Sequence, residues 1–287
     1  MKINGNSFLL MVTVLLFIVM YAAGMVIFAD KGFAKPQMFL NLFISNAGLL
    51  VIAMGQTIVM ITGGIDISVG SVTALVCMLC AYDMEKKGMS AYMAVAIALL
   101  IGLLFGIVQG FLVSYLEIQP FIVSLAGMFF GRGMTSIIST DMISIKNKTF
   151  LAWANYKIYL PIGSYSRRGK FIPAYIYPTV IIAILIFIVV LDGLLAGCGG
   201  FLFCLNSCSG FVEQAKGLEM DAISASVIGG TLLSGGVGTP FGTVFGVLIK
   251  GTISSLITTQ GTLSSCGYVS HFPHYCASSL YCVRYLV

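Results

Sequence analysis

Long apolar stretches alternate with short polar connections along most of the chain. A helix needs about 20 apolar residues to cross the hydrocarbon core of a bilayer. The pattern predicts spanning segments at 8–29, 38–61, 67–82, 91–116, 120–138 and 177–206, at 222–233 together with 241–259, and a weaker one at 268–287. We therefore expect an all-α, polytopic transmembrane helix bundle, with about seven or eight helices in a single domain over residues 1–287.

One connection, residues 139–172, is long and polar. It carries an excess of basic residues over its one acid, Asp141: Lys146, Lys148, Lys157, Arg167, Arg168 and Lys170. Because short loops rich in lysine and arginine tend to stay in the cytoplasm, the charge count places this loop there. The other connections are nearly balanced in charge and do not fix the orientation.

Two apolar stretches are interrupted by glycine-rich segments with the same pattern. "GGIDISVG" (63–70) and "GGTLLSGG" (229–236) share G-G-x-x-x-S-x-G. Non-helical backbone at membrane depth must be buried in protein or line a watery cavity. Transporters are often built from repeated halves whose interrupted helices flank the substrate path. The sequence thus predicts broken helices, a weak internal repeat and a solute pathway near both segments.

Asp66 is the only acid between Asp30 and Asp83, and two interpretations of it stay open. Aspartate and serine are favoured at helix N-termini, so Asp66 and Ser68 can cap the helix that follows. An ionisable group at membrane depth is also a candidate functional residue, because its carboxylate can accept hydrogen bonds from a solute. Capping is the favoured interpretation, and direct contact with the solute is the alternative.

Several further residues inside apolar stretches have a structural and a functional interpretation. Small residues four apart let helices approach closely, and packing is the expected role of Gly102, Gly106, Gly110, Gly238, Gly242 and Gly246. Lys250 is expected to extend its stem to the surface, with the pathway or a subunit interface as alternatives. Arg132, near a predicted helix end, is expected to be an anchor, with a pathway role as the alternative.

Composition supports a membrane protein and excludes other classes. Of the 287 residues 59% are hydrophobic and 9% are charged, whereas a soluble domain has about a quarter charged. The net charge of +5 is dispersed, which argues against nucleic-acid binding. The first apolar stretch is longer than the core of a signal peptide and reads as a retained helix. The six cysteines of the last third form no C-x-x-C pair for a metal, and Cys77 and Cys80, inside an apolar stretch, read as small core residues. Enzyme motifs are missing.

Three stretches carry a resemblance to a known family: "GQTIVMITGGIDISVGSVTAL" (55–75), "PFIVSLAGMFFGRGMTSIIS" (120–139) and "DAISASVIGGTLLSGGVGTPFGTVFGVLIKG" (221–251). The chain resembles the membrane-spanning permease subunits of bacterial ABC sugar importers, in the ribose/xylose/galactofuranose branch, and looks closest to a galactofuranose importer permease. The resemblance covers about residues 8–190 and 193–265.

The resemblance implies a multi-pass protein of the bacterial inner membrane that moves a monosaccharide. Its implied partners are a second permease copy or paralogue, a periplasmic sugar-binding protein and a cytoplasmic ATPase, which would bind the ATP, so that the permease itself holds no cofactor. The resemblance also places loop 139–172 in the periplasm, and we prefer this to the charge count. The residues that match the family motifs are Gly63, Gly64, Asp66, Ser68, Gly70 and Ser71, then Gly229, Gly230, Ser234, Gly235 and Gly236, and Arg132 as the arginine usual after the fifth helix.

The sequence departs from the family pattern in two places. After residue 190 the resemblance implies a basic cytoplasmic loop that contacts the ATPase, but the chain passes directly to "LDGLLAGCGGFLF", as if a loop and one helix were lost near 190–193. The tail 266–287 is rich in Cys, His and Tyr, which is the composition expected after a reading-frame change. The alternatives to an active importer permease are a transport-inactive remnant, or a secondary transporter or channel with Asp66 as a proton or cation site.

Overall fold

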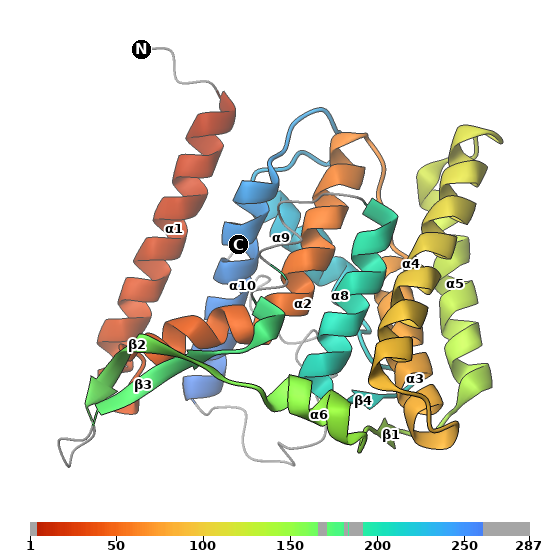
Figure 1. The fold of residues 1–287 in the computed structure, drawn as a ribbon. Coiled ribbons are helices and arrows are strands. Elements are labelled where there is room, and N and C mark those ends of the chain that lie inside the picture. The colour runs from red at the N-terminus through yellow and green to blue at the C-terminus, as the bar shows by residue number, and fades with distance from the viewer. Residues whose placement is uncertain (1–4, 166–170, 181–182, 184–191, 261–287) are drawn as a thin grey trace.

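The computed structural model describes residues 5–165, 171–180, 183 and 192–260, and it is predominantly helical there (Figure 1). The longer helices are α1 (Gly5–Ile27), α2 (Pro36–Ile61), α3 (Val69–Lys86), α4 (Ala91–Ser114), α5 (Pro120–Ile138), α8 (Asp192–Ser207) and α10 (Pro240–Gln260). Shorter elements are η1 (Ala29–Lys31), α6 (Lys148–Asn155), α9 (Leu218–Ile228), β1 (Ile143–Ser144), β2 (Ile158–Tyr165), β3 (Phe171–Ile176) and β4 (Ser209–Gly210).

The helices confirm the expected membrane bundle. The first five predicted spans coincide with α1 to α5 to within a few residues. Within the described ranges, α1, α2, α4, α5 and α10 are long and apolar enough to cross a membrane. Part of the predicted span 177–206 and all of 268–287 lie outside the described residues, as does the tail 266–287.

Local sequence signals set several helix starts. Pro36 and Pro120 occupy the first turn of α2 and α5, where a missing N–H leaves no hydrogen bond unmade. Ser90 precedes α4, and its side chain accepts a hydrogen bond from the Met93 N–H at 3.4 Å. These signals explain why the predicted boundaries agree with the structure so closely.

The core lies where α8 packs against α2, α3 and α4. Small residues allow this approach: a Cβ at Gly48 would lie 3.1 Å from the Phe203 nitrogen, and one at Gly197 would lie 3.2 Å from the Gly102 Cα. The packing role predicted for Gly102 is therefore confirmed. Cys77 and Cys80 are buried free thiols in this core, as expected. In the described part of the chain no group of three or more metal-ligating side chains is found.

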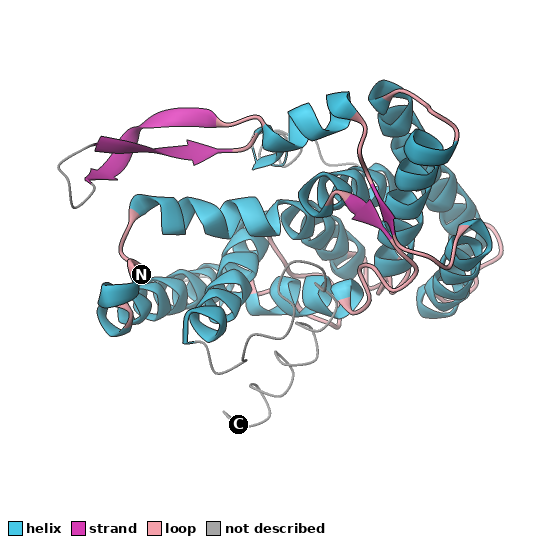
Figure 2. Cartoon of the chain, turned by 90° about the horizontal axis from the view of Figure 1, so that it is seen from below, coloured by secondary structure: helices cyan, strands magenta, loops and turns pink. Residues whose placement is uncertain are grey.

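The polar connection 139–172 is more structured than the sequence pattern predicts. β1 pairs with β4 in antiparallel register, with Ile143 opposite Gly210. β2 and β3 form an antiparallel hairpin, with Tyr165 opposite Phe171, that extends along one side of the bundle (Figure 2). The β1–β4 pairing joins segments far apart in sequence, and no local pattern signals such a contact.

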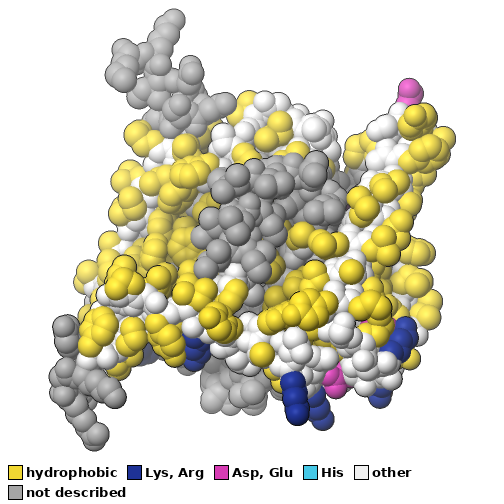
Figure 3. Space-filling view, in the orientation of Figure 1, with side chains coloured by type: hydrophobic (Ala, Val, Ile, Leu, Met, Phe, Trp, Pro, Cys, Tyr) yellow, Lys and Arg dark blue, Asp and Glu magenta, His cyan; other side chains and the backbone are white. Residues whose placement is uncertain are grey.

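Hydrophobic side chains cover much of the face seen in Figure 3, while lysine and arginine gather at its lower edge. Large apolar residues of α1, α4 and α5 are exposed, among them Leu15, Ile107 and Phe129. A soluble monomer rarely exposes apolar surface on this scale. The surface therefore fits a protein whose solvent is lipid.

Candidate functional site

The first glycine-rich segment breaks the helix that α2 and α3 would otherwise form. α2 ends at Ile61 and α3 begins at Val69. Gly63 has a φ of +85°, in the left-handed region that favours glycine. The Gly63 and Gly64 N–H groups donate back to the Met60 and Val59 carbonyls at 2.9 and 3.0 Å, so the turn that leaves α2 satisfies its own donors.

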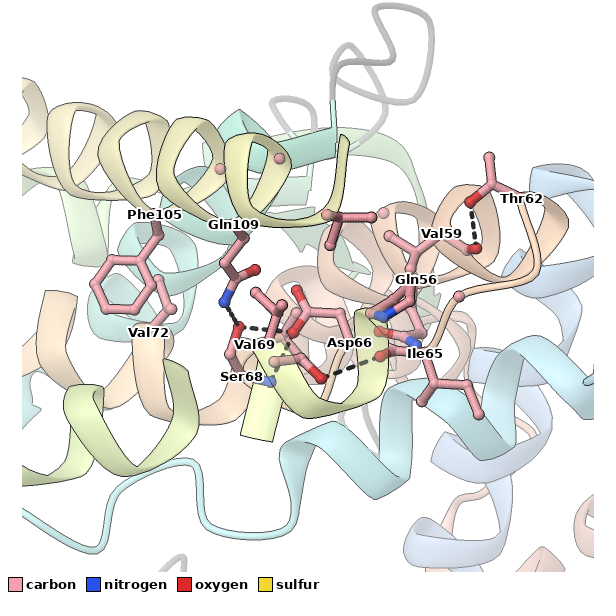
Figure 4. Close-up of a pocket in the computed structure, with 18 of the residues that line it drawn as sticks. Gln56, Val59, Thr62, Ile65, Asp66, Ser68, Val69, Val72, Phe105 and Gln109 are labelled. Atoms are coloured by element: carbon pink, nitrogen blue, oxygen red, sulfur yellow. Dashed lines mark hydrogen bonds between the residues drawn. The ribbon is translucent and has the colours of Figure 1, made fainter. Parts of the chain in front are cut away.

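A chain of polar side chains closes around Asp66. Asp66 Oδ1 accepts hydrogen bonds from the Ser68 N–H at 2.7 Å and from Ser68 Oγ at 2.6 Å. Ser68 Oγ in turn accepts from Gln109 Nε2 at 2.9 Å, which brings α4 to the break. Figure 4 shows Gln109 pointing from α4 toward Ser68, with Asp66 beside it.

Two other side chains satisfy the backbone of the break. The Gln56 amide on α2, with its nitrogen turned toward Asp66, donates to the Asp66 carbonyl at 2.9 Å and accepts from its N–H at 3.3 Å. Ser124 Oγ on α5 donates to the Ile65 carbonyl at 3.1 Å. Side chains of α2, α4 and α5 thus hold an irregular segment that water would otherwise have to satisfy.

A cavity of about 670 Å³ lies beside this network, between α2, the break, α4 and α5. Its volume falls within the range of about 300–1,000 Å³ typical of small-molecule sites. Most of the wall is apolar, and Asp66, Ser68, Gln56, Gln109 and Ser124 are among the residues that supply polar groups to it. Such a wall offers several hydrogen-bonding partners to a polar solute.

The second glycine-rich segment, between α9 and α10, contacts the first break directly. The Gly236 N–H donates to the Ile61 carbonyl at 2.9 Å. A Cβ at Gly235 would lie 2.8 Å from the Gly63 Cα, so the two backbones touch. Both Gly235 and Gly236 have left-handed φ values, +83° and +79°. The two related segments therefore meet, although a long stretch of sequence separates them.

Close packing and hydroxyl contacts hold the second segment in this position. Gly242 and Gly246 lie against α9: a Cβ at Gly246 would be 1.9 Å from the Ala225 carbonyl oxygen, which confirms their predicted packing role. The buried Thr57 Oγ1 on α2 lies 3.0 Å from Ser226 Oγ and 2.5 Å from Thr243 Oγ1. Hydroxyls between helices strengthen association in lipid, where no hydrophobic effect drives it.

The structure divides the predicted site residues into three groups. Four of them line the cavity: Gly63, Gly64, Asp66 and Ser68. The residues Gly229, Gly230, Ser234, Gly235 and Gly236 belong to the second break and are not part of the cavity wall.

The third group, Gly70, Ser71 and Arg132, does not line the cavity and makes packing contacts elsewhere. A Cβ at Gly70 would lie 2.0 Å from Glu219 Oε2, and Gly131 packs on Ser71. Arg132 lies inside α5 rather than after it, and its Nη1 donates to the Val212 and Gln214 carbonyls at 3.2 and 3.1 Å. Arg132 thereby ties α5 to the segment before α9.

The expected cap takes a form that differs from the prediction. Ser68 is the residue before α3, but its side chain accepts no bond from the first turn of that helix. Its hydroxyl is instead shared between Asp66 and Gln109. Asp66 binds the Ser68 N–H, just outside α3, and also faces the cavity. The structure therefore keeps both a local structural role and a solute contact available to Asp66.

Sequence reasoning missed the polar residues that other helices bring to the break. Gln56 and Gln109 carry amide side chains inside predicted apolar stretches, and this could have marked them as candidate site residues. Lys250 was expected to reach the surface, but its Nζ lies 2.8 Å from Asp221 Oδ2, and this ion pair joins α9 to α10. Gly106 and Gly110 were expected to pack helices, but they line the cavity.

Comparison with known proteins points to transport. Residues 38–190 match a family described as "Branched-chain amino acid transport system / permease component". The chain is 35% identical to the inner membrane ABC transporter permease protein YjfF of Escherichia coli K12, over 89% of the chain and 86% of that protein. It is 34% identical to the ribose import permease protein RbsC of Bacillus subtilis, over 82% and 81%, and 27% identical to the fructose import permease protein FruG of Bifidobacterium longum, over 91% and 86%. No solved structure matches the chain.

Proposed function

The chain belongs to the permease components of ABC importers, in the branch whose named relatives import sugars, and from this membership we propose that it moves a monosaccharide across the bacterial inner membrane. Family membership makes it a multi-pass membrane protein that is not an enzyme. ATP would be bound by a separate ATPase subunit, a periplasmic binding protein would deliver the sugar, and a second permease would complete the pore.

The observation that carries this proposal is the group of polar side chains that line the cavity at the first break. Gln56, Asp66, Ser68 and Gln109 present amide, carboxylate and hydroxyl groups from three elements to one space. A sugar carries many hydroxyls, each of which can donate and accept, so a cluster of mixed donors and acceptors suits it better than a single charge would. We assign these side chains as the contacts that orient the sugar. Pentoses and hexoses, galactofuranose included, are the proposed substrate class.

An uptake assay tests the proposal. The chain is expressed with a candidate ATPase and a candidate sugar-binding protein, and right-side-out vesicles that contain ATP are supplied with labelled ribose, fructose, galactofuranose or leucine. We expect uptake of one or more of the sugars that stops when ATP is depleted and continues when an ionophore collapses the membrane potential. Uptake of leucine alone, or uptake that follows the ionophore and ignores ATP, would reject the proposal.

A transport-inactive remnant is a second candidate, and a specific observation supports it. The family match ends at residue 190. The alignment with YjfF runs over 285 residues and covers 89% of the 287 here, which leaves about 30 aligned positions of that relative without a counterpart. We interpret these positions as the segment whose loss the sequence pattern predicts near 190–193. Co-purification with the ATPase decides: a stable complex supports the importer, and a chain that folds but never binds the ATPase supports the remnant.

A further inference from the structure

A second cavity, of about 560 Å³, lies away from the sugar site, between α4, α6 and α8. Val95 and Leu99 of α4 form one wall, Phe201 and Leu202 of α8 form another, and Trp153 of α6 closes the end. The wall is almost entirely apolar, and the cavity is open on one side. An ordered water needs two to four polar partners, which this wall does not supply, so the occupant has to be apolar.

Helix α6, which lines one wall of this cavity, is fixed by specific contacts. Asn147 Oδ1 accepts from the Thr149 and Phe150 N–H groups at 3.1 and 3.2 Å, which caps the helix. Glu85 Oε1, at the end of α3, accepts from the Lys146 and Asn147 N–H groups at 2.7 and 3.0 Å.

The apolar side of α6 is equally well fixed. The fully buried Phe150 packs edge to face on Phe201, with ring centroids 6.0 Å apart. The helix is therefore a built part of the bundle and holds its side of the cavity in place.

The aromatic residues of α6 place it at the level of the membrane–water interface. Trp153 packs edge to face on Tyr92, with centroids 4.9 Å apart, and Tyr92 is the second residue of α4. Tyr92 and Tyr156 are exposed, at 69% and 61%. Tryptophan and tyrosine concentrate where a spanning helix meets the headgroups, and the start of α4 is such a point. From there the cavity extends along α4 and α8, in the direction of the hydrocarbon.

Basic residues stand at both ends of α6. Lys146 and Lys148 are exposed at its start, and Lys157 is exposed just after Tyr156 at its end. Glu85, the acidic residue that contacts the start of α6, accepts its hydrogen bonds from the Lys146 and Asn147 N–H groups. An anionic headgroup therefore finds positive charge beside the opening of an apolar cavity.

We propose that this cavity binds one acyl chain of an anionic phospholipid, with the lipid phosphate held at the lysines that flank α6. The proposal is independent of which solute the protein moves. It commits to a lipid because the bundle stands in a membrane, where phospholipids are the abundant molecules that join apolar acyl chains to a phosphate.

Trp153, the only tryptophan in the chain, allows a direct test because it lines the cavity. The full chain is reconstituted in nanodiscs of phosphatidylcholine, and phosphatidylglycerol with brominated acyl chains is added stepwise to quench its fluorescence. We expect quenching that saturates at a low mole fraction of brominated phosphatidylglycerol. Brominated phosphatidylcholine should quench only in proportion to its mole fraction. Equal, unsaturable quenching by both lipids, or no quenching by either, would overturn the proposal.

Matched variants distinguish the cavity from the surrounding lipid. Val95→Phe fills the cavity and should abolish the saturable phase, whereas Val108→Phe, at an exposed position on the same helix, should leave it intact. Leu99→Phe serves as the filling variant if Val95→Phe fails to elute as a single species. Neutralising Lys148 and Lys157 to glutamine should weaken the preference for phosphatidylglycerol about fivefold per lysine. A saturable phase that survives both filling variants would contradict the assignment.

Discussion

Replacing Gly235 by alanine should destabilise the protein much more than the same change at its neighbour Gly236. Both residues have left-handed backbone angles, φ +83° and +79°, so alanine meets the same backbone strain at each position. They differ in what surrounds them. A Cβ at Gly235 would lie 2.8 and 3.0 Å from the Gly63 Cα and nitrogen, whereas a Cβ at Gly236 would meet nothing within 4 Å.

The expected magnitude follows from these two terms. A non-glycine residue in the left-handed region costs about 1–2 kcal/mol. Forcing a methyl group against fixed backbone adds about 1–3 kcal/mol, as for other overpacked sites. Gly236→Ala should therefore lose about 1–2 kcal/mol. Gly235→Ala should lose about 1–3 kcal/mol more than that, which is a difference of about 5- to 150-fold in the unfolding equilibrium.

The free energy of unfolding is measured by titration with sodium dodecyl sulfate in mixed micelles, followed by the fluorescence of Trp153. Sugar uptake is measured in parallel, because the contact positions the first break beside the cavity. Gly235→Ala should lower both, and Gly236→Ala should retain most of the uptake. Equal losses of stability in the two variants would contradict this prediction, since they would show that the contact between Gly235 and Gly63 contributes nothing.

Three further predictions concern side-chain contacts. Asp221→Asn leaves the Lys250 ammonium without its ion-pair partner and should lower the free energy of unfolding by about 3–5 kcal/mol. The double variant Asp221→Leu/Lys250→Met should have a free energy of unfolding near that of the parent chain. A double variant as unstable as the single one would contradict this. Arg132→Met removes two charged hydrogen bonds to backbone carbonyls and should cost about 2 kcal/mol in the same titration, unlike a neutral surface change. Gln109→Leu should raise the KM of uptake several-fold with little change in the free energy of unfolding, and an unchanged KM would place the sugar elsewhere. Asp66→Asn should raise the KM less than Asp66→Ala, because the amide oxygen of the asparagine still accepts a hydrogen bond from the Ser68 N–H.

The membrane bundle could be predicted from the sequence because its signals are local. The length of each apolar stretch and prolines such as Pro36 and Pro120 mark the spanning helices without reference to any partner. The two breaks were also predictable, because left-handed turns at Gly63 and Gly235 require glycine and leave a readable pattern.

The contacts between these elements could not be predicted in the same way. Nothing near Ile61 indicates that Gly236 will donate to its carbonyl, and nothing near Ser68 indicates that Gln109 will reach it from another helix. The pairing of β1 with β4 depends likewise on how α8 packs. Glycines four apart were ambiguous for the same reason: Gly102, Gly106 and Gly110 all line the cavity, and of these Gly102 also packs on Gly197 of α8.

Passage of the sugar through the cavity at the first break can be tested at Gly110. A Cβ at Gly110 or at Gly133 meets nothing within 4 Å, but only Gly110 lines the cavity. Gly110→Cys and Gly133→Cys are each treated with a benzyl methanethiosulfonate, and sugar uptake is compared with the treated parent chain. Modification at position 110 should block uptake and should be slowed by transported sugar, while modification at position 133 should do neither. Full modification at position 110 with uptake unchanged would contradict this.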